Sequence, residues 1–450
     1  MRTIFLLLAA TAMVALPLIS QESSGQMQMT GGSNMESMPG MQMGPMSESP
    51  DKNQMTMPSD SFIEFLQSHS TSGTDAEPNS TPSQMLMTSR GNWTFMLHGV
   101  AFLNYIQQTG PRGADKLFST NWIMPMAERK VGPGTLTLRT MLSLEPATIS
   151  ERRYPELFQV GETAYGRPLT DAQHPHNFFM ELAASYEYMA GENTMLCFYA
   201  APVGDPAMGP AAFPHRASAA ENPIGPLGHH FEDSTHIADD VITAGITHGM
   251  VRLEASGFHG REPDEFRWDI DSGKIDSWST RVTVNPGQNW SAQYSIAQLH
   301  SPEAFVPAED IRRLTASVIY NRPLRNGNWA TTLIWGRNQS LMNGDVGNAY
   351  LTESTVQFFR RNFAWTRIEN VDRTNELLLG DNPIPVNFTE RYIGRIQAYT
   401  LGYDRDIGNI PHLSTALGAQ VTWYGVPQIL QPLYNPHPAG VVVFLRVRAY

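Results

Sequence analysis

The sequence has one cysteine, few charged residues and no second long apolar run. Cys197 alone cannot form an internal disulfide, and its position far from the N-terminus excludes a lipid anchor on an N-terminal cysteine. After the run from Ile4 to Leu18, no segment reaches the roughly 18 consecutive apolar residues of a transmembrane helix, so helical spans are excluded. The net charge of −12, with 16% charged residues, argues against nucleic acid as a partner.

The N-terminal residues have the pattern of a secretory signal peptide. Arg2 precedes the apolar run 4–18, and small and polar residues follow it. Because this run is shorter than the roughly 20 apolar residues of a membrane anchor, we predict that residues 1–20 are removed on export. Ser20 and Ser23 both lie in the candidate cleavage region.

Residues 21–60 are rich in methionine, glycine, serine, proline and glutamine. No aliphatic or aromatic residue lies between Ile19 and Phe62, so this segment has nothing from which to build a core and is predicted to be disordered. Thioether sulfur is a soft ligand that selects Cu(I), and Met-X-Met and Met-X-X-Met spacings bring several sulfurs to one ion without a fold. We therefore predict capture of Cu(I) or Ag(I), with no obligatory cofactor; the alternative is a plain polar tether. The predicted ligands are Met27, Met29, Met35, Met38, Met41, Met43, Met46, Met55 and Met57.

Residues 61–91 are predicted to form a short helix followed by a linker. In the segment 61–70, Phe62, Phe65 and Leu66 share one helical face. Two outcomes remain open for this helix: it docks on or plugs the domain that follows, or it stays part of a tether.

From residue 92 to residue 450, short segments alternate apolar and polar residues. Examples are Trp278, Thr280, Val282 and Val284 against Ser279, Arg281 and Thr283, and Val251, Leu253 and Ala255 against Arg252, Glu254 and Ser256. Period two is typical of β-strands, and membrane barrels alternate lipid-facing and lumen-facing residues in this way. A soluble β-sandwich would alternate as well, so the connection lengths must separate the two folds.

The connections favour a barrel of about sixteen strands, with 14 to 18 possible. Tight turns are expected at 131–134, 190–193, 246–249, 285–288, 325–328, 360–362 and 406–409, and the connections between them are longer, about 10 to 37 residues. Short turns that alternate with long loops are typical of outer-membrane barrels. The predicted fold class is therefore all-β, a transmembrane antiparallel β-barrel over residues 92–450 in the bacterial outer membrane, with the disordered N-terminal segment in the periplasm.

The last residue, Tyr450, resembles the terminal aromatic signal that the bacterial barrel-assembly machinery reads. This machinery and outer-membrane lipid are therefore expected partners. The match is imperfect, because Arg446 and Arg448 share parity with Tyr450 at positions where that signal usually has apolar residues.

The long loop 201–237 is predicted to fold into the barrel and to determine what passes. It carries three histidines and two carboxylates within eight positions: His229, His230, Glu232, Asp233 and His236. Imidazole suits copper, zinc and nickel, and rings of carboxylates favour cations. The loop before it contributes His174 and His176, which lie two residues apart and would share one side of an extended chain. These seven residues complete the predicted metal ligands; the alternative is ordinary polar loop surface.

No catalytic residue is predicted. Outer-membrane phospholipases use a Ser–His–Asn arrangement, and this chain has His248 and many serines. However, no spacing identifies a nucleophile, and the G-x-S-x-G motif is absent. We therefore expect a protein that is not an enzyme.

The chain resembles two kinds of outer-membrane protein. An export signal, Met-X-Met motifs (Met27-Gln28-Met29, Met41-Gln42-Met43, Met55-Thr56-Met57) and a β-barrel together resemble the copper-resistance proteins of Gram-negative bacteria, although sixteen strands exceed that family's number. In architecture alone, the barrel is similar to the general porins, whose third loop forms a constriction. Residues 72–82 and 169–182 also resemble an uncharacterised group of exported bacterial proteins, from which no function carries over.

Two functional hypotheses follow. In the first, the protein binds or transports copper or another soft metal and supports metal resistance, with metal ions as its ligands. In the second, it is a porin-like channel or structural outer-membrane protein for unrelated small solutes. Porin-like barrels are often trimers, so the resemblance implies a homotrimer, although no segment identifies an interface.

Overall fold

The computed structural model describes residues 61–450 except 70, 235–237, 381, 387 and 450. The predicted signal peptide, 1–20, and the methionine-rich segment, 21–60, lie outside the described residues. In the described part of the chain, no helix is long and apolar enough to cross a membrane.

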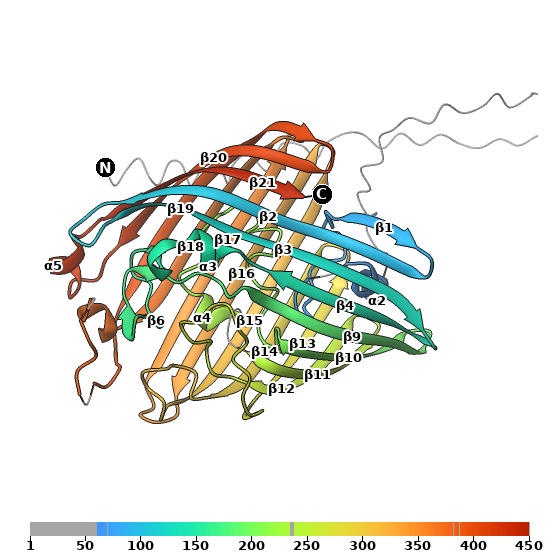
Figure 1. Cartoon of the computed structure of the whole chain (residues 1–450), viewed down its shortest axis with the longest axis horizontal. Helices are drawn as coiled ribbons and strands as arrows, with labels where there is room; N and C mark the ends of the chain where they lie inside the picture. The colour runs from blue at the N-terminus through green and yellow to red at the C-terminus, as the bar shows by residue number, and fades with distance from the viewer. Residues whose placement is uncertain (1–60, 70, 235–237, 381, 387, 450) are drawn as a thin grey trace, which may run out of the picture. The chain divides into compact units, whose positions relative to one another are not determined.

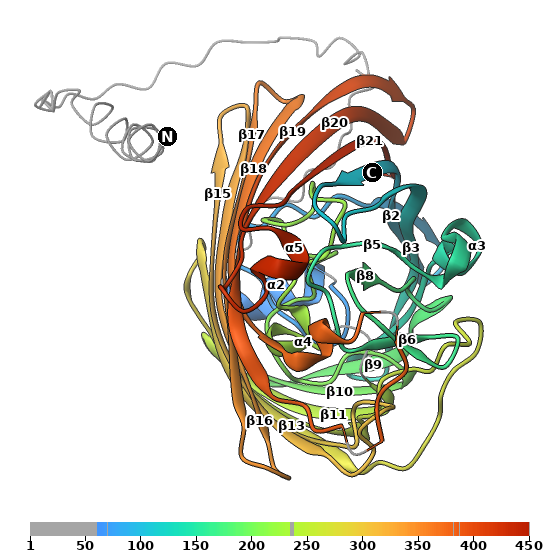
Figure 2. The ribbon, with the colours of Figure 1, turned by 90° about the vertical axis from the view of Figure 1, so that its left-hand side faces the viewer.

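Sixteen antiparallel strands form a closed barrel (Figures 1 and 2). The sheet has 17 strands, of which the short β1 (Leu86–Arg90) pairs only with β2 and the other sixteen form the ring. Each ring strand pairs with the next along the chain, and the last strand, β21, pairs with the first, β2, from Gly99↔Ala449 to Gln108↔Gly440. The ring strands are β2 (Trp93–Gln108), β3 (Asp115–Val131), β4 (Gly134–Leu142), β9 (Phe179–Gly191), β10 (Thr194–Val203), β11 (Asp239–His248), β12 (Val251–His259), β13 (Ser277–Gly287), β14 (Trp290–His300), β15 (Asp310–Leu324), β16 (Gly327–Ser340), β17 (Val346–Phe358), β18 (Asn362–Thr374), β19 (Tyr392–Ile410), β20 (Leu413–Gly425) and β21 (Ala439–Ala449). The predicted fold class and strand number are confirmed.

The alternation of side chains explains why these segments become barrel strands. On β12, the Leu253 side chain is 53% exposed on the outer face, whereas Arg252 and Glu254 are 2% and 5% exposed on the inner face. The same parity holds on β13, where Trp278 is 44% exposed and Arg281 is 4% exposed. An apolar outer face suits lipid, and ring closure pairs the edge strands that an open sheet would leave unsatisfied in a membrane.

The predicted turn at 406–409 is wrong. Strand β19 continues through these residues to Ile410, and the chain turns at Pro411 and His412 instead. The composition Asp-Ile-Gly-Asn is typical of a turn, but here the register between β19 and β20 shifts between Asp406 and Gly408. Such a bulge accommodates an extra residue without ending the strand.

The interior of the barrel is occupied by the chain itself. Viewed along the barrel in Figure 2, α2 (Phe62–Ser68), α4 (His229–Glu232) and α5 (Gln431–Tyr434) lie within the ring of strands. The remaining short elements belong to the loops: α3 (Glu145–Thr148), η1 (Ser150–Arg152), η2 (Asn375–Leu378), the strand pair β5 (Tyr154–Pro155) and β8 (Ala172–Gln173), and the strand pair β6 (Glu162–Ala164) and β7 (Arg167–Leu169). In Figure 1, β1 and α2 lie toward the end of the barrel with the tight turns, and β6 and α5 lie toward the other end.

The lipid-facing position of Leu333 gives a test of the barrel. This side chain is 49% exposed in the middle of β16, so Leu333→Arg should lower the free energy of unfolding in lipid by about 2–4 kcal/mol. Leu324, 40% exposed at the end of β15, is the matched control, and Leu324→Arg should cost about 0–1 kcal/mol. Urea titration of both variants in bilayers measures the difference, and equal costs would contradict this placement in the membrane.

Candidate functional site in the barrel lumen

The first described segment, residues 61–85, lies inside the barrel and is called the plug here. Its helix α2 starts at Ser61, whose side chain caps the helix by accepting a hydrogen bond from the Glu64 backbone N–H at 3.1 Å. Phe62 and Phe65 are buried, and so is almost all of the extended stretch 71–83 that follows. Of the two outcomes left open by the sequence, the structure therefore has the docked one.

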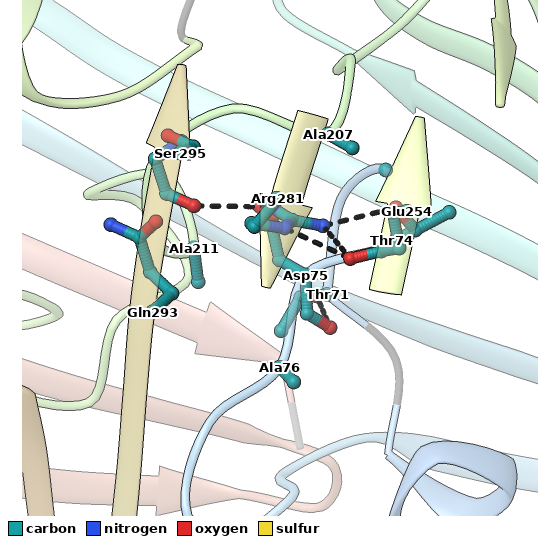
Figure 3. Close-up of polar contacts among 12 residues, drawn as sticks. Thr71, Thr74, Asp75, Ala76, Ala207, Ala211, Glu254, Arg281, Gln293 and Ser295 are labelled. Carbon is teal, nitrogen blue, oxygen red and sulfur yellow. Dashed lines mark hydrogen bonds and ion pairs between the residues drawn. The ribbon is translucent and has the colours of Figure 1, made fainter. Parts of the chain in front are cut away.

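Arg281, on the inner face of β13, joins the plug to the barrel wall (Figure 3). Its guanidinium donates to the Asp75 carboxylate and, at 3.0 Å, to the Thr74 hydroxyl, both in the plug. It also donates to Glu254 of β12 at 2.9 Å and to the Gly209 carbonyl at 3.1 Å. Burial raises the pKa of Asp75 to about 6 against the opposing effect of Arg281, so this carboxylate is largely ionised above neutral pH. One side chain thus links the plug, the wall and the long loop.

Further polar contacts hold the plug along its length. Asn285 donates to the side-chain oxygen of Asn79 at 3.0 Å, and Asn321 donates to the Ser80 carbonyl at 2.7 Å. Arg139 of β4 donates to the Thr71 and Gly73 carbonyls. Gly73 has a φ of +57°, and a Cβ atom there would lie 2.7 Å from that of Asp205 in the long loop, so this contact requires glycine. The plug is attached mainly through hydrogen bonds and ion pairs.

The long loop predicted at 201–237 lies between β10 and β11, and its described residues 204–234 and 238 fold into the lumen. Arg216 is fully buried and donates to Glu353 of β17 at 2.8 Å and to Asp233 at 3.2 Å. Arg367 of β18 donates to the other oxygen of Glu353 at 3.2 Å. The loop is therefore held to the far wall by a buried chain of alternating charges.

The predicted ligands in this loop do not converge on one point. Asp233 pairs with Arg216, whereas the Glu232 carboxyl is buried and neither oxygen has a hydrogen-bond partner among the described residues. Burial and the nearby Glu369 raise the pKa of Glu232 well above its usual value. The Nδ1 atom of His229 lies 2.7 Å from the Pro226 carbonyl oxygen, and burial lowers the pKa of this imidazole. The fifth candidate, His236, lies outside the described residues.

His230 and His174 instead meet at Glu162 in the loop 143–178. The Oε1 atom of Glu162 lies 2.6 Å from His174 Nε2 and 3.2 Å from His230 Nε2. Arg267 reaches the other oxygen at 3.4 Å. Glu162, His230 and Glu262 each offer a ligand atom within 4.8 Å of the others. Burial alone would raise the pKa of Glu162, but its contacts with the two histidines outweigh burial and hold this pKa well below its usual value.

His176 contacts a different carboxylate. Its Nδ1 atom lies 2.7 Å from the Glu145 carboxylate, which also accepts from the His176 backbone N–H at 2.8 Å. The sequence alone did not identify Glu145, Glu162, Glu262 and Arg267 as partners of the histidines. The sequence showed only that acidic residues occur in the neighbouring loops. The contacts between the loops depend on closure of the barrel, which the sequence of a single loop does not reveal.

The imperfect terminal motif also has a structural reason. Arg446 and Arg448 of β21 face the lumen, and both bind the Glu221 carboxylate of the long loop. Arg446 further donates to Asp406 at 2.7 Å. At these two positions, where the terminal signal usually has apolar residues, the arginines form ion pairs that hold the long loop against the last strand. Tyr450 lies outside the described residues.

The plug and the loops leave cavities between them inside the barrel, and four of these have volumes of about 140, 60, 50 and 40 Å³. The cavity of about 140 Å³ lies between the plug, the long loop and the inner faces of β2 and β3, where His69, His98 and His215 line it. In the described part of the chain, the plug and the loops thus occupy the lumen.

Glu156, buried in the loop 143–178, predicts a pH dependence of stability. Burial, with the nearby Glu369, raises its pKa from 4.5 to about 8, so the folded protein keeps a proton that the unfolded chain loses. The contribution of this group to stability should fall as pH rises from 4.5 to about 8 and stay level above that. Glu156→Gln should flatten this part of the profile in urea unfolding, whereas the exposed control Glu151→Gln should not. An unchanged profile in the Glu156 variant would contradict the assignment.

The sequence matches no protein-family model and no curated protein. Solved structures with a similar fold include an anion-selective porin from Comamonas acidovorans, with 12% identity over 79% of this chain and 99% of that chain and a TM-score of 0.49. OprB of Pseudomonas putida has 8% identity over 80% and 94% of the chains, with a TM-score of 0.48. OmpT of Vibrio cholerae, in a trimer form, has 7% identity over 79% and 99%, with a TM-score of 0.43. These similarities are at the level of the fold alone.

Proposed function

We propose that this chain is a porin-like channel of the Gram-negative outer membrane that passes small solutes or ions when its plug moves. The observation that carries the proposal is the closed sixteen-stranded ring with an apolar outer face and a charged inner face. A lumen with charged walls favours water and polar solutes over apolar ones. The tight turns would face the periplasm, and the long loops would face the outside.

The plug is the movable part in this proposal. Within the described residues, the chain continues from the plug into the barrel at one end, through the β1–β2 hairpin, whereas the long loop is continuous with ring strands at both ends, β10 and β11. Many of its contacts with the wall are polar, and water can replace these when the plug leaves. The ion pair of Asp75 with Arg281 joins two charged side chains of the plug and the wall. We therefore expect it to determine how often the plug is displaced.

The channel proposal predicts that Asp75→Ala increases conductance. Loss of a charge-assisted hydrogen bond costs about 1.5–3 kcal/mol, which corresponds to roughly a 10- to 150-fold increase in the displaced fraction. Arg281 keeps Glu254 as a partner, so the barrel should still fold. Planar-bilayer recordings of the wild type and the variant measure the open fraction.

Two controls make this experiment decisive. Asp269→Asn, in an exposed loop between β12 and β13, should leave conductance unchanged. Deletion of residues 61–85 should give a permanently open channel. A deletion variant that inserts but stays closed would overturn the channel proposal, and an unchanged Asp75→Ala variant would exclude the plug as the movable part.

A role in binding Cu(I) is the second candidate function, and it is supported by the nine methionines between residues 26 and 57. The Glu162–His230–Glu262 group carries less weight, because His174, His230 and Arg267 already compensate the charge of Glu162. The oxygen and nitrogen donors of that group also suit harder divalent ions better than Cu(I).

Replacement of residues 27–57 by a methionine-free segment of equal length should test the copper role. The variant should bind fewer Cu(I) ions in competition with a chromophoric chelator, and cells that carry it should tolerate less copper. A variant in which the same positions are scrambled should keep both properties. Full Cu(I) binding and tolerance without the methionines would remove the support for a copper role.

A further inference from the structure

Methionine and histidine side chains gather on the inner wall of β2, β3 and β4, beside an apolar cluster that includes Val100 and Phe102 of β2. Met124 is fully buried, and Met96, Met126 and Met141 are at most 8% exposed. Met85 of the plug and Met180 of β9 pack against the same group. Strand register brings the members together, because Met96 is paired with Met126 and His98 with Met124 across β2 and β3.

Two histidines place a ring nitrogen directly against a methionine sulfur in this group. His98 Nε2 lies 3.1 Å from Met124 Sδ. His215 Nε2, from the long loop, lies 3.4 Å from Met141 Sδ. The two imidazole ring centres are 5.7 Å apart, so the two histidine–methionine pairs are neighbours in the lumen.

These separations suit a shared metal ion. With metal–nitrogen and metal–sulfur bonds of about 2.0 and 2.3 Å, tetrahedral coordination places nitrogen and sulfur about 3.5 Å apart. The observed separations of 3.1 and 3.4 Å need only small side-chain shifts to accept an ion. Thioether and imidazole donors together, without a carboxylate among them, select a soft monovalent ion over a hard divalent one.

The group also borders a cavity. His98 and His215 line the cavity of about 140 Å³, together with His69 of the plug and the carboxylates Glu77 and Glu221. Such a volume holds an ion with several waters. The plug, which supplies Met85 and His69, directly follows the methionine-rich residues 21–60 in the sequence.

We propose that Met124, Met141, His98 and His215 bind a soft monovalent cation, Cu(I) or Ag(I), within the barrel lumen. The site rests on the proposed channel function, for which it names the class of transported ion. The ordinary alternative is that these side chains are a packing cluster between the wall and the loop, held by weak N–H···S contacts. The two explanations differ in whether silver binds here.

Tryptophan emission can report on this site without interference from the leader. The first tryptophan of the chain is Trp93, and the Trp122 ring centre lies 4.9 Å from that of His215 and 5.1 Å from that of His98. Titration of the full-length protein in detergent with Ag(I) should therefore quench part of the emission in a saturable manner. Trp122→Phe should bind the same number of silver ions and lose this quenching.

The double variant Met124→Leu/Met141→Leu tests the ligands. Leucine conserves the volume of methionine, so the fold should persist, while silver bound at equilibrium dialysis should fall by one ion per chain and the quenching should be lost. The matched control Met250→Leu/Met342→Leu changes two methionines that are 52% and 50% exposed and should match the wild type. Unchanged silver binding in the folded double variant, or quenching that survives in Trp122→Phe, would overturn the site.

Failure of the channel proposal has a different signature. A barrel that stays closed in lipid after deletion of the plug would reject transport, while the silver stoichiometry would still be measured in detergent. Conversely, an open channel in which Ag(I) binds wild type and double variant equally would reject the site and leave the channel in place.

Discussion

Pairing of the first strand with the last is the constraint on which the rest of the molecule depends. In lipid, every backbone N–H and C=O group of a spanning segment needs a partner within the protein, and an open sheet edge leaves a row of them without one. Contact between β2 and β21 removes both edges at once. Closure of the ring also creates an interior. The plug and the long loop form their hydrogen bonds and ion pairs with the inner faces of the strands in that interior. Arg281, Arg216 and Arg446 can bind across that interior because the ring brings strands and loops of distant sequence together.

Arginine is the residue that organises this interior. Its guanidinium has five N–H donors, so one side chain can satisfy several acceptors that come from different segments. Arg281 contacts Thr74, Asp75 and Gly209 in addition to its neighbour Glu254. A buried charge without partners would be strongly destabilising, so each such arginine fixes the position of the segments around it. The lumen thereby holds a network of charges beside buried apolar clusters such as that of Phe158, Leu227 and Phe231.

The sequence predicted the barrel well because a strand in a membrane is a local pattern. Period two along β12 and β13 was enough to assign which side chains face lipid, and six of the seven predicted turns lie where two consecutive ring strands meet. Local pattern failed at 406–409, where a bulge has the composition of a turn. The local pattern also could not predict that His174 contacts Glu162, or that His98 contacts Met124. Those contacts depend on strand register and on loops that cross the lumen.

The hairpin between β1 and β2 gives the plug a property that a separate inhibitor would not have. Because the chain runs from the plug directly into β1 and β2, a plug that leaves the lumen would remain covalently attached to the barrel. Its return is an intramolecular event, governed by an effective concentration that for a short tether reaches the millimolar range and that does not change with the amount of protein in the membrane. Closure would therefore be fast and independent of expression level, and only the strength of the contacts inside the barrel would set how long an opening lasts.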